Sequence, residues 1–349
     1  MYQTDGGNAR RLAGSRLRED QRVEAEGCKG YYGANCLGGG NLNLAVELAL
    51  GNNRGLRLQN PVMAASGTVG YGVEYAKVVD IEKLGAVVSK GTTLMPRSGN
   101  PQVRLAETAS GLLNSIGLQN VGVDAVVEEY APTWSTWGVP VIVNVAGESV
   151  DEYARVASKL EGVAGISGIE VNISCPNVAM GGMEFGKSPE MAAAVTEAVK
   201  AQTTLPVIVK LTPNVTDVTE MALAVVAAGA DAVSLINTVA GMTIDIVERK
   251  PFLGGVVGGL SGPAVRPVAV YMVYQVCGAV DIPVIGCGGI ASAEDALEFI
   301  MAGASAVQIG TATMVNPGTP HKIIDGLRAF MEKEGIEDIR ELVGVARVS

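Results

Sequence analysis

The sequence predicts an α/β fold of the (β/α)8 class, the TIM barrel, and three observations support this prediction. From about Leu44 onward, short apolar, β-branched runs bounded by Gly or Pro alternate with stretches of helical period, which is typical of parallel strands joined by helices. Eight such units lie within roughly 300 residues, which fits the size range of this barrel. The segment Ala228–Val233 (AGADAV) recurs as Ala302–Val307 (AGASAV), both times between a helix and a strand, which indicates reuse of one structural unit.

The expected strands and helices follow from these runs in chain order. The eight strands are expected at Val62–Ala65, Ala86–Lys90, Val141–Ala146, Gly168–Ser174, Val207–Leu211, Ala232–Ile236, Pro283–Gly286 and Ala306–Gly310. The clearest helices are expected at Glu148–Leu160, Pro189–Ala201, Asp217–Ala228, Pro263–Val276, Ala293–Met301 and His321–Lys333.

One connection interrupts the alternation of strands and helices. Between Lys90 and a helix near Val123 lie some thirty residues rich in Gly, Pro, Asn and Ser, and loops of this length inside a compact domain are usually functional. This connection follows the second strand, so we expect a long active-site loop over the face where TIM-barrel active sites lie.

Residues 1–43 are polar and lack a sustained period. We expect an N-terminal extension there, disordered or not native to the protein, outside a single domain at residues 44–349.

Composition limits the class of protein. The 349 residues are 48% apolar and 18% charged, with a net charge of −10, so a sizeable core is expected and nucleic acid or an anionic membrane is not an expected partner. Apolar stretches are interrupted by charges well before the 18 or so residues that a membrane span needs. Five scattered cysteines favour reduced thiols and therefore a cytoplasmic protein.

The chain has a single histidine, His321. A metal site built from several histidines is thereby excluded, and a Ser-His-Asp mechanism would rest on His321 alone. His321 follows the last expected strand, where a structural role is expected. We expect no metal, and we expect catalysis to use Lys, Cys, Asn, carboxylates or a cofactor.

Polar residues end or directly follow six of the eight expected strands: Ser66, Lys90, Asn144, Asn172, Lys210 and Asn237. The carboxyl ends of barrel strands point into the active site, so these six together predict one large polar ligand. The two lysines suit a delocalised negative charge, such as that of a reduced flavin, or a carboxylate. A Schiff-base aldolase would also use a lysine at the end of a strand, so this pattern leaves both chemistries open.

Glycine turns follow the last two strands, Gly286-Cys287-Gly288-Gly289 and Gly310-Thr311-Ala312-Thr313. Barrels commonly bind phosphate at this corner through backbone N–H groups, which is the interpretation we favour. Residues 286–291 also match the dinucleotide pattern G-x-G-x-x-G/A, but Val307–Thr311, about 20 residues further on, contains no acidic residue for a ribose.

Cys175 follows the fourth strand in the segment Asn172–Asn177 (NISCPN). A thiol whose pKa is brought toward neutrality can act as a general base, and Cys175 is the cysteine best placed to do so.

Residues 181–188 (GGMEFGKS) match the P-loop pattern G-x-x-x-x-G-K-S/T. A P-loop nucleotide-binding module is a minor alternative, because the match begins seven residues beyond Ser174 and no other expected strand ends in an aspartate for Mg²⁺.

With these residues assembled, the chain from about Leu44 to its C-terminus resembles the dihydroorotate dehydrogenases of class 1, most closely the catalytic subunit of the NAD-linked class 1B form. The resemblance rests on these segments: Asn60–Gly67, Lys90–Thr93, Glu107–Asn120 with its core NSIGLQN, the Cys175 segment, Val209–Asn214, Ile236–Thr238, Gly258–Pro263 and the two glycine turns. Membrane-bound class 2 enzymes match less well, because they carry an N-terminal membrane helix and a serine in place of Cys175.

The resemblance implies flavin mononucleotide (FMN) on the carboxyl face of the barrel. Its phosphate would lie at Gly288, Gly289, Gly310 and Thr311, with Gly262 nearby. Its ribityl chain and ring would be lined by Ser66, Lys90, Gly91, Asn144, Asn172, Lys210 and Ile236. Dihydroorotate would be bound by Lys90, by Asn114, Ser115, Ile116, Gly117 and Leu118 of the long loop, and by Asn172, Asn237 and Thr238.

The implied reaction produces orotate in the de novo synthesis of pyrimidines (UMP). Cys175 would take the proton from C5 while C6 delivers a hydride to the flavin, with Lys90 and Lys210 as the other catalytic residues. The asparagines and lysines found above fit the amide edges and the carboxylate of this substrate.

The electrons must then leave the flavin. The chain has neither the cysteine spacing of an iron–sulfur cluster nor a convincing nicotinamide fold, so a partner is expected. Class 1B implies a subunit that carries FAD and a 2Fe–2S cluster and reduces NAD⁺, in a heterotetramer built on a homodimer. The fumarate-linked class 1A is the alternative; Val178–Gly182 and Phe185-Gly186 favour class 1B.

Overall fold

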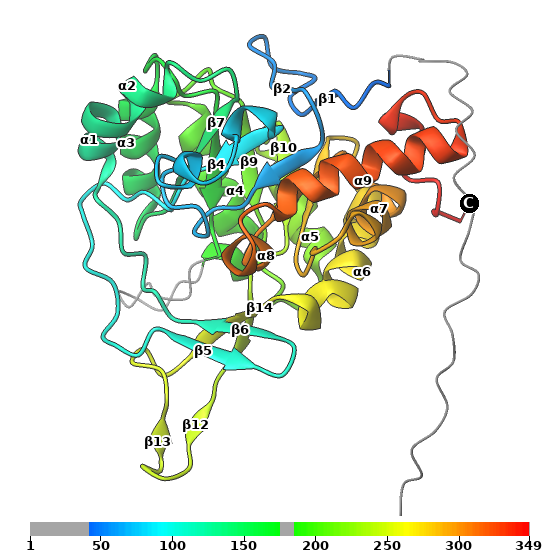
Figure 1. Cartoon of the computed structure of the whole chain (residues 1–349). Helices are drawn as coiled ribbons and strands as arrows, with labels where there is room; N and C mark the ends of the chain where they lie inside the picture. Colours follow the sequence, from blue (N-terminus) through cyan, green and yellow to red (C-terminus); the bar gives the residue numbers. More distant parts are fainter. Residues whose placement is uncertain (1–41, 175–184, 349) are drawn as a thin grey trace, which may run out of the picture. The chain divides into compact units, whose positions relative to one another are not determined.

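The computed structural model describes residues 42–174 and 185–348. Eight parallel strands close into a barrel (Figure 1), which confirms the predicted TIM-barrel fold. In chain order these strands are β3 (Val62–Ala64), β4 (Ala86–Val88), β7 (Val141–Val145), β8 (Gly168–Asn172), β9 (Val207–Lys210), β10 (Ala232–Leu235), β15 (Val284–Cys287) and β16 (Ala306–Ile309). Each strand pairs with its neighbours in this series, and β16 closes the barrel by pairing with β3.

The barrel strands are buried almost completely on both faces. All five residues of β7 are buried, and so are all four residues of β9, β10, β15 and β16. Parallel strands covered by helices read as continuous apolar runs rather than as alternating patterns. For this reason the strands could be located from the sequence to within two residues at each end.

The predicted helices surround the barrel as α3 (Val150–Leu160), α4 (Pro189–Lys200), α5 (Val218–Ala227), α6 (Arg266–Cys277), α7 (Ala293–Ala302) and α9 (Thr319–Glu334). Four of them begin at side-chain caps, because Ser149, Ser188, Asp217 and Ser292 each accept a hydrogen bond from a backbone N–H of the first turn. Such caps satisfy N–H groups that have no partner within the helix. Helix α6 begins three residues later than predicted, because Pro263–Val265 forms a 3-10 turn.

Two insertions combine into a second, antiparallel sheet. The loop after β4 contains β5 (Leu105–Thr108) and β6 (Gly111–Asn114), and the segment after β10 contributes β11 (Val239–Gly241) and β14 (Gly258–Ser261), in the order β11-β14-β6-β5. A short hairpin, β12 (Ile244–Asp245) and β13 (Lys250–Pro251), projects away from this sheet (Figure 1). The long loop after β4 agrees with the prediction from the sequence, whereas its two strands and the second insertion were not predicted.

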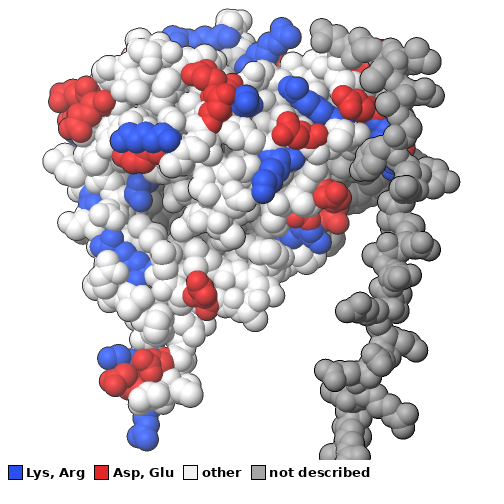
Figure 2. Space-filling view, in the orientation of Figure 1, with Lys and Arg blue, Asp and Glu red and all other residues white. Residues whose placement is uncertain are grey.

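The remaining described elements are short. The amino-terminal part forms a hairpin of β1 (Val46–Glu47) and β2 (Arg57–Leu58). The connections contain α1 (Val123–Ala125), a π-helical turn (Val126–Tyr130), α2 (Ala131–Trp134), α8 (Thr311–Val315) and 3-10 turns at Tyr75–Lys77, Ile81–Lys83, Phe185–Lys187 and Ile339–Leu342. None of the helices in the described part combines the length and the apolar character needed to cross a membrane. Basic and acidic side chains are interspersed over the face drawn in Figure 2.

Candidate active site

A large cavity of about 980 Å³ opens at the carboxyl ends of the barrel strands. Its volume is at the upper end of the range for small-molecule sites, about 300–1,000 Å³. Its lining includes every predicted binding residue in the described part of the chain: Ser66, Lys90, Gly91, Asn114, Ser115, Ile116, Gly117, Leu118, Asn144, Asn172, Lys210, Ile236, Asn237, Thr238, Gly262, Gly288, Gly289, Gly310 and Thr311. The fold therefore brings together residues that are up to 245 positions apart in the chain, from Ser66 to Thr311.

Cys175 lies outside the described residues. Its chain neighbours Ile173 and Ser174 line the cavity, as do Gly186 and Lys187. The P-loop match at residues 181–188 lies partly outside the described residues too. Its last residue, Ser188, is the N-cap of α4 and accepts a hydrogen bond from the N–H of Met191.

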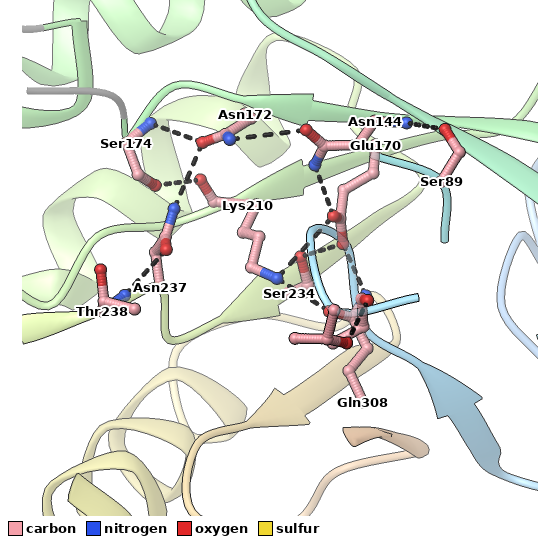
Figure 3. A network of polar contacts seen from close by, with 12 residues as sticks. Ser89, Asn144, Glu170, Asn172, Ser174, Lys210, Ser234, Asn237, Thr238 and Gln308 are labelled. Atoms are coloured by element: carbon pink, nitrogen blue, oxygen red, sulfur yellow. Dashed lines mark hydrogen bonds and ion pairs between the residues drawn. The ribbon is translucent and has the colours of Figure 1, made fainter. Parts of the chain in front are cut away.

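Amide side chains form a continuous series along the barrel (Figure 3). Asn237 Oδ1 accepts from the backbone N–H of Thr238 at 2.8 Å, and Asn237 Nδ2 donates to Asn172 Oδ1 at 3.3 Å. Asn172 Nδ2 contacts Asn144 Oδ1 at 3.5 Å, and Asn144 Nδ2 donates to Glu170 Oε1 at 2.7 Å. Because each amide has two donors and an acceptor oxygen with two lone pairs, the series fixes their orientation and still leaves hydrogen-bonding capacity for a ligand.

The two lysines of the site have different surroundings. Lys210 is buried, and its Nζ donates to Gln308 Oε1 at 2.9 Å and lies 3.8 Å from Glu170 Oε1. Burial by itself would lower the pKa of Lys210, but the charges facing it, chiefly Glu170, raise the pKa above the ordinary value for lysine. A Schiff-base lysine must react as the free amine, so this environment does not favour Lys210 as an aldolase nucleophile.

Lys90 is only partly buried and makes no ion pair with the residues that the structure describes. Burial and the positive charge of Arg104 lower the pKa of Lys90. A bound carboxylate would supply the missing negative partner. Lys90 is therefore suited to bind an anionic ligand, whereas Lys210 already has a counter-charge within the protein.

Three polar residues of the barrel interior were missed by the sequence analysis: Glu170, Ser234 and Gln308. Glu170 is fully buried and accepts from Asn144, from Ser234 Oγ at 3.0 Å and from Gln308 Nε2 at 2.5 Å. The sequence itself marks two of these residues as unusual. A glutamate interrupts the apolar run Gly168–Asn172, and a glutamine interrupts Ala306–Ile309. These residues stand inside the strands, whereas a ligand is contacted directly by residues at the strand ends.

The glycine turns bring backbone segments together at one side of the cavity. Gly262 and Gly289 have φ angles of +90° and +74°, in the region that favours glycine. A Cβ atom at Gly289 would lie 2.8 Å from the carbonyl oxygen of Gly262 and 2.9 Å from the backbone N of Arg266, which is too close for any side chain. At Gly310 a Cβ would meet no atom closer than 3.7 Å, so the protein itself has room there. Thr311 Oγ1 donates to Ser261 Oγ at 2.8 Å.

His321 and Cys287 are two further candidate reactive side chains in the described part of the chain. His321 contacts the carbonyl oxygen of Asp80 at 2.8 Å and does not line the cavity. Cys287 is buried in the cavity wall, and burial raises its pKa. Within the described ranges, no group of three or more His, Cys, Asp or Glu residues is arranged to hold a metal ion.

The chain is similar to known proteins over most of its length. The family described as dihydroorotate dehydrogenase matches residues 50–331. A protein of Desulforudis audaxviator named dihydroorotate dehydrogenase B (NAD(+)), catalytic subunit, is 58% identical over 292 residues, which cover 84% of this chain and 95% of the relative. A protein of the same name from Desulforamulus reducens is 56% identical over 307 residues, covering 88% of this chain and 99% of the relative. A third protein of this name, from Geotalea uraniireducens, is 52% identical over 305 residues, which cover 87% of this chain and 98% of the relative.

Proposed function

Because the chain belongs to the dihydroorotate dehydrogenase family, we propose that it is the catalytic subunit of the NAD-linked class 1B enzyme, which oxidises dihydroorotate to orotate in pyrimidine biosynthesis. The observation that carries the proposal is the large cavity at the carboxyl face of the barrel, lined by the amides, lysines and glycine turns described above. The names of the relatives support the NAD-linked form over the fumarate-linked one.

FMN is the cofactor that we propose for this cavity. The donor set fits it, because the positive charge of Lys210 and the amides of Asn144 and Asn172 suit the polar edge of a flavin ring. Gly310 leaves open space that a side chain would occupy, which suits a phosphate held by backbone N–H groups. When bound, the flavin supplies the two-electron acceptor for oxidation of the substrate.

The residues of the chain would bind and orient the substrate. Lys90, whose charge has no counter-ion among the described residues, would pair with the carboxylate of dihydroorotate. Asn172 and Asn237, together with Asn114 of the long loop, would bond the amide edges of its ring. Ser115–Leu118 and Thr238 would complete the enclosure, which excludes water from the reacting atoms.

Cys175 would act as the general base that removes the proton from C5. Proton transfer by a positioned side chain contributes roughly 10²- to 10⁴-fold to a rate. Lys210 would contribute a positive charge in the wall of the cavity, near the polar edge of the flavin ring.

Electrons would leave through a partner subunit carrying FAD and a 2Fe–2S cluster, in a heterotetramer built on a homodimer of this chain. The phrase "catalytic subunit" in the names of the relatives supports the presence of a partner in such enzymes.

The proposed function is tested by anaerobic reduction and reoxidation. The purified chain should carry a flavin whose visible absorbance is lost when dihydroorotate is added without oxygen. The reduced flavin should then be reoxidised by NAD⁺ only when the co-expressed partner is present. Reoxidation by fumarate without a partner would indicate the class 1A enzyme, and a chain that neither contains nor takes up FMN would contradict the proposal.

A further inference from the structure

Glu170 occupies the centre of a polar network inside the barrel and has no part in the proposed reaction. Its side chain on β8 is fully buried and accepts hydrogen bonds from three other strands, through Asn144 on β7, Ser234 on β10 and Gln308 on β16 (Figure 3). Carboxylates are almost never fully buried unless they are paired. Glu170 does not line the cavity, so it can affect a ligand only through its neighbours.

Asn144 and Lys210 both line the cavity and contact Glu170, and Lys210 is the charged one of the two. The Lys210 Nζ lies 3.8 Å from Glu170 Oε1, and Gln308 bridges the two groups. The Gln308 Oε1 accepts from Lys210, while its Nε2 donates to Glu170 Oε2. Because the carboxylate only accepts hydrogen bonds, it determines that the oxygen end of the Gln308 amide faces Lys210. Glu170 thereby orients the lysine both directly and through Gln308.

The charge balance around Lys210 depends on the same carboxylate. An unpaired ammonium group in a protein interior is costly and tends to lose its proton. Within residues 42–174 and 185–348, the titratable groups that face Lys210 are Glu170 from β8 and Cys287 from β15. Burial raises the pKa of the Cys287 thiol, so this thiol is neutral at neutral pH. Among the described residues, Glu170 is therefore the negative charge that balances Lys210.

We propose that Glu170 is a positioning residue, which keeps the ammonium group of Lys210 charged and directed into the cavity, so that the bound flavin meets a fixed positive charge. The flavin in this statement rests on the proposed function, whereas the pairing of Glu170 with Lys210 does not. A neutral amine at the same place could not balance the negative charge that a flavin gains on reduction. Glu170 would therefore determine whether the reduction of the flavin is accompanied by protonation of Lys210.

The first test uses the apoprotein and needs no flavin. The side-chain carbon resonances of isotopically labelled lysine report each ammonium group, and Lys210→Arg assigns the resonance of Lys210. In the wild type, Lys210 should stay protonated beyond the ordinary pKa of lysine, about 10.4. In Glu170→Gln it should lose its proton at least one pH unit lower. Ser234→Ala is the matched control, because it removes one hydrogen bond to the same carboxylate and keeps the charge, so Lys210 should titrate as in the wild type.

The second test uses the holoprotein and measures proton uptake during reduction of the flavin. Above the lowered pKa of Lys210, the Glu170→Gln protein should take up about one proton more per flavin than the wild type, because the neutral amine of Lys210 would accept a proton from solvent when negative charge is added beside it. Its reduction potential should accordingly depend more steeply on pH. Ser234→Ala should match the wild type, and Glu170→Asp, which retains the carboxylate one methylene further away, should lie between the wild type and Glu170→Gln.

The two tests separate this proposal from the proposed function. If Lys210 titrates alike in the wild type and in Glu170→Gln, or if proton uptake on reduction is the same in both, the role of Glu170 is refuted. If Glu170→Gln does not fold, the titration of Lys210 in Glu170→Asp decides. The aspartate carboxylate lies one methylene further from Lys210, so the pKa of Lys210 should fall below its wild-type value. If the apoprotein result holds and no flavin binds, the proposed function fails while the Glu170–Lys210 pairing stands.

Discussion

Asn237 donates a hydrogen bond from Nδ2 to Oδ1 of Asn172, 3.3 Å away, and so connects the carboxyl ends of β10 and β8 inside the cavity. Each amide holds the other in one orientation, because a carbonyl oxygen and an amide N–H₂ are not interchangeable. A substrate that uses both side chains therefore meets a pair that is already oriented.

We predict that Asn172→Ala and Asn237→Ala each lower kcat/KM for dihydroorotate about tenfold or more, since a net hydrogen bond is worth about 0.5–1.5 kcal/mol and a bond that strengthens in the transition state is worth more. Because the two amides orient each other, the free-energy losses in the double variant should not add. Asn52→Ala, in the turn between β1 and β2 and outside the cavity, is the control. Strict additivity would contradict mutual orientation.

Cys175 is predicted to be the general base. Cys175→Ala should keep its flavin spectrum and lose about 10²- to 10⁴-fold in the rate of flavin reduction at neutral pH, measured by anaerobic stopped flow. Cys277→Ala is the matched control, because Cys277 lies outside the cavity lining and burial raises its pKa to about 12. Reduction of Cys175→Ala at the wild-type rate would remove Cys175 from the mechanism.

Gly289 is predicted to be required for the phosphate turn. Gly289→Ala should weaken FMN binding strongly, because its Cβ would collide with the backbone of Gly262 and Arg266. Gly162 has nearly the same φ, +73° against +74°, but a Cβ there would meet nothing within 4 Å. Gly162→Ala should therefore show only the left-handed strain of about 1–2 kcal/mol in thermal unfolding and bind FMN normally. Equal FMN affinity in the two variants would argue against the turn as a phosphate site.

The pH dependence of orotate binding should report Lys90. Because burial and Arg104 lower the pKa of Lys90, the ammonium form that pairs with a carboxylate is lost at a lower pH than for an ordinary lysine. Orotate should bind with constant affinity at neutral pH and more weakly as the pH rises through this lowered pKa, by up to tenfold per unit. Lys90→Arg should abolish the alkaline loss, because arginine stays charged. Spectral titration of the flavin measures the affinity, and a wild-type affinity that stays constant beyond pH 10 or so would exclude Lys90 as the partner of the carboxylate.

Acid stability should depend on Glu161, which lies between the end of α3 and the start of β8 and does not line the cavity. Hydrogen bonds from Thr203 and Thr204 and the charge of Arg54 lower the pKa of Glu161 to about 2. A carboxyl group whose pKa is lowered by folding stabilises the fold above its unfolded pKa of about 4.3 and loses this contribution as the pH falls toward the folded value.

Glu161→Gln should therefore lower the midpoint of thermal unfolding at pH 7, and its difference from the wild type should shrink between about pH 5 and pH 2. Glu332→Gln, at an exposed position of α9, serves as the control and should match the wild type throughout. A Glu161→Gln difference that does not change with pH would show that the carboxylate charge is not the cause.

The barrel was predictable because its signals are local. Each strand is a short apolar run such as Val141–Val145, and each helix is an apolar period with a cap such as Ser149 or Ser292. The antiparallel sheet was not predictable in this way. Its strand β6 pairs with β14, with Asn114 opposite Gly259, and both strands have only four residues and begin with glycine, so neither shows a strand pattern alone.

The sequence by itself determined the barrel and the residues at its carboxyl face, because parallel strands joined by helices place all their carboxyl ends at one face, whatever the details of packing. Only the tertiary structure decided what lies beneath that face. Lys210 meets Gln308, 98 positions away, and Glu170 on a third strand, because the closed barrel turns side chains of different strands toward a common interior. Whether a lysine has a counter-charge depends on such distant contacts, and so the difference between Lys90 and Lys210 could not be found from the strand pattern.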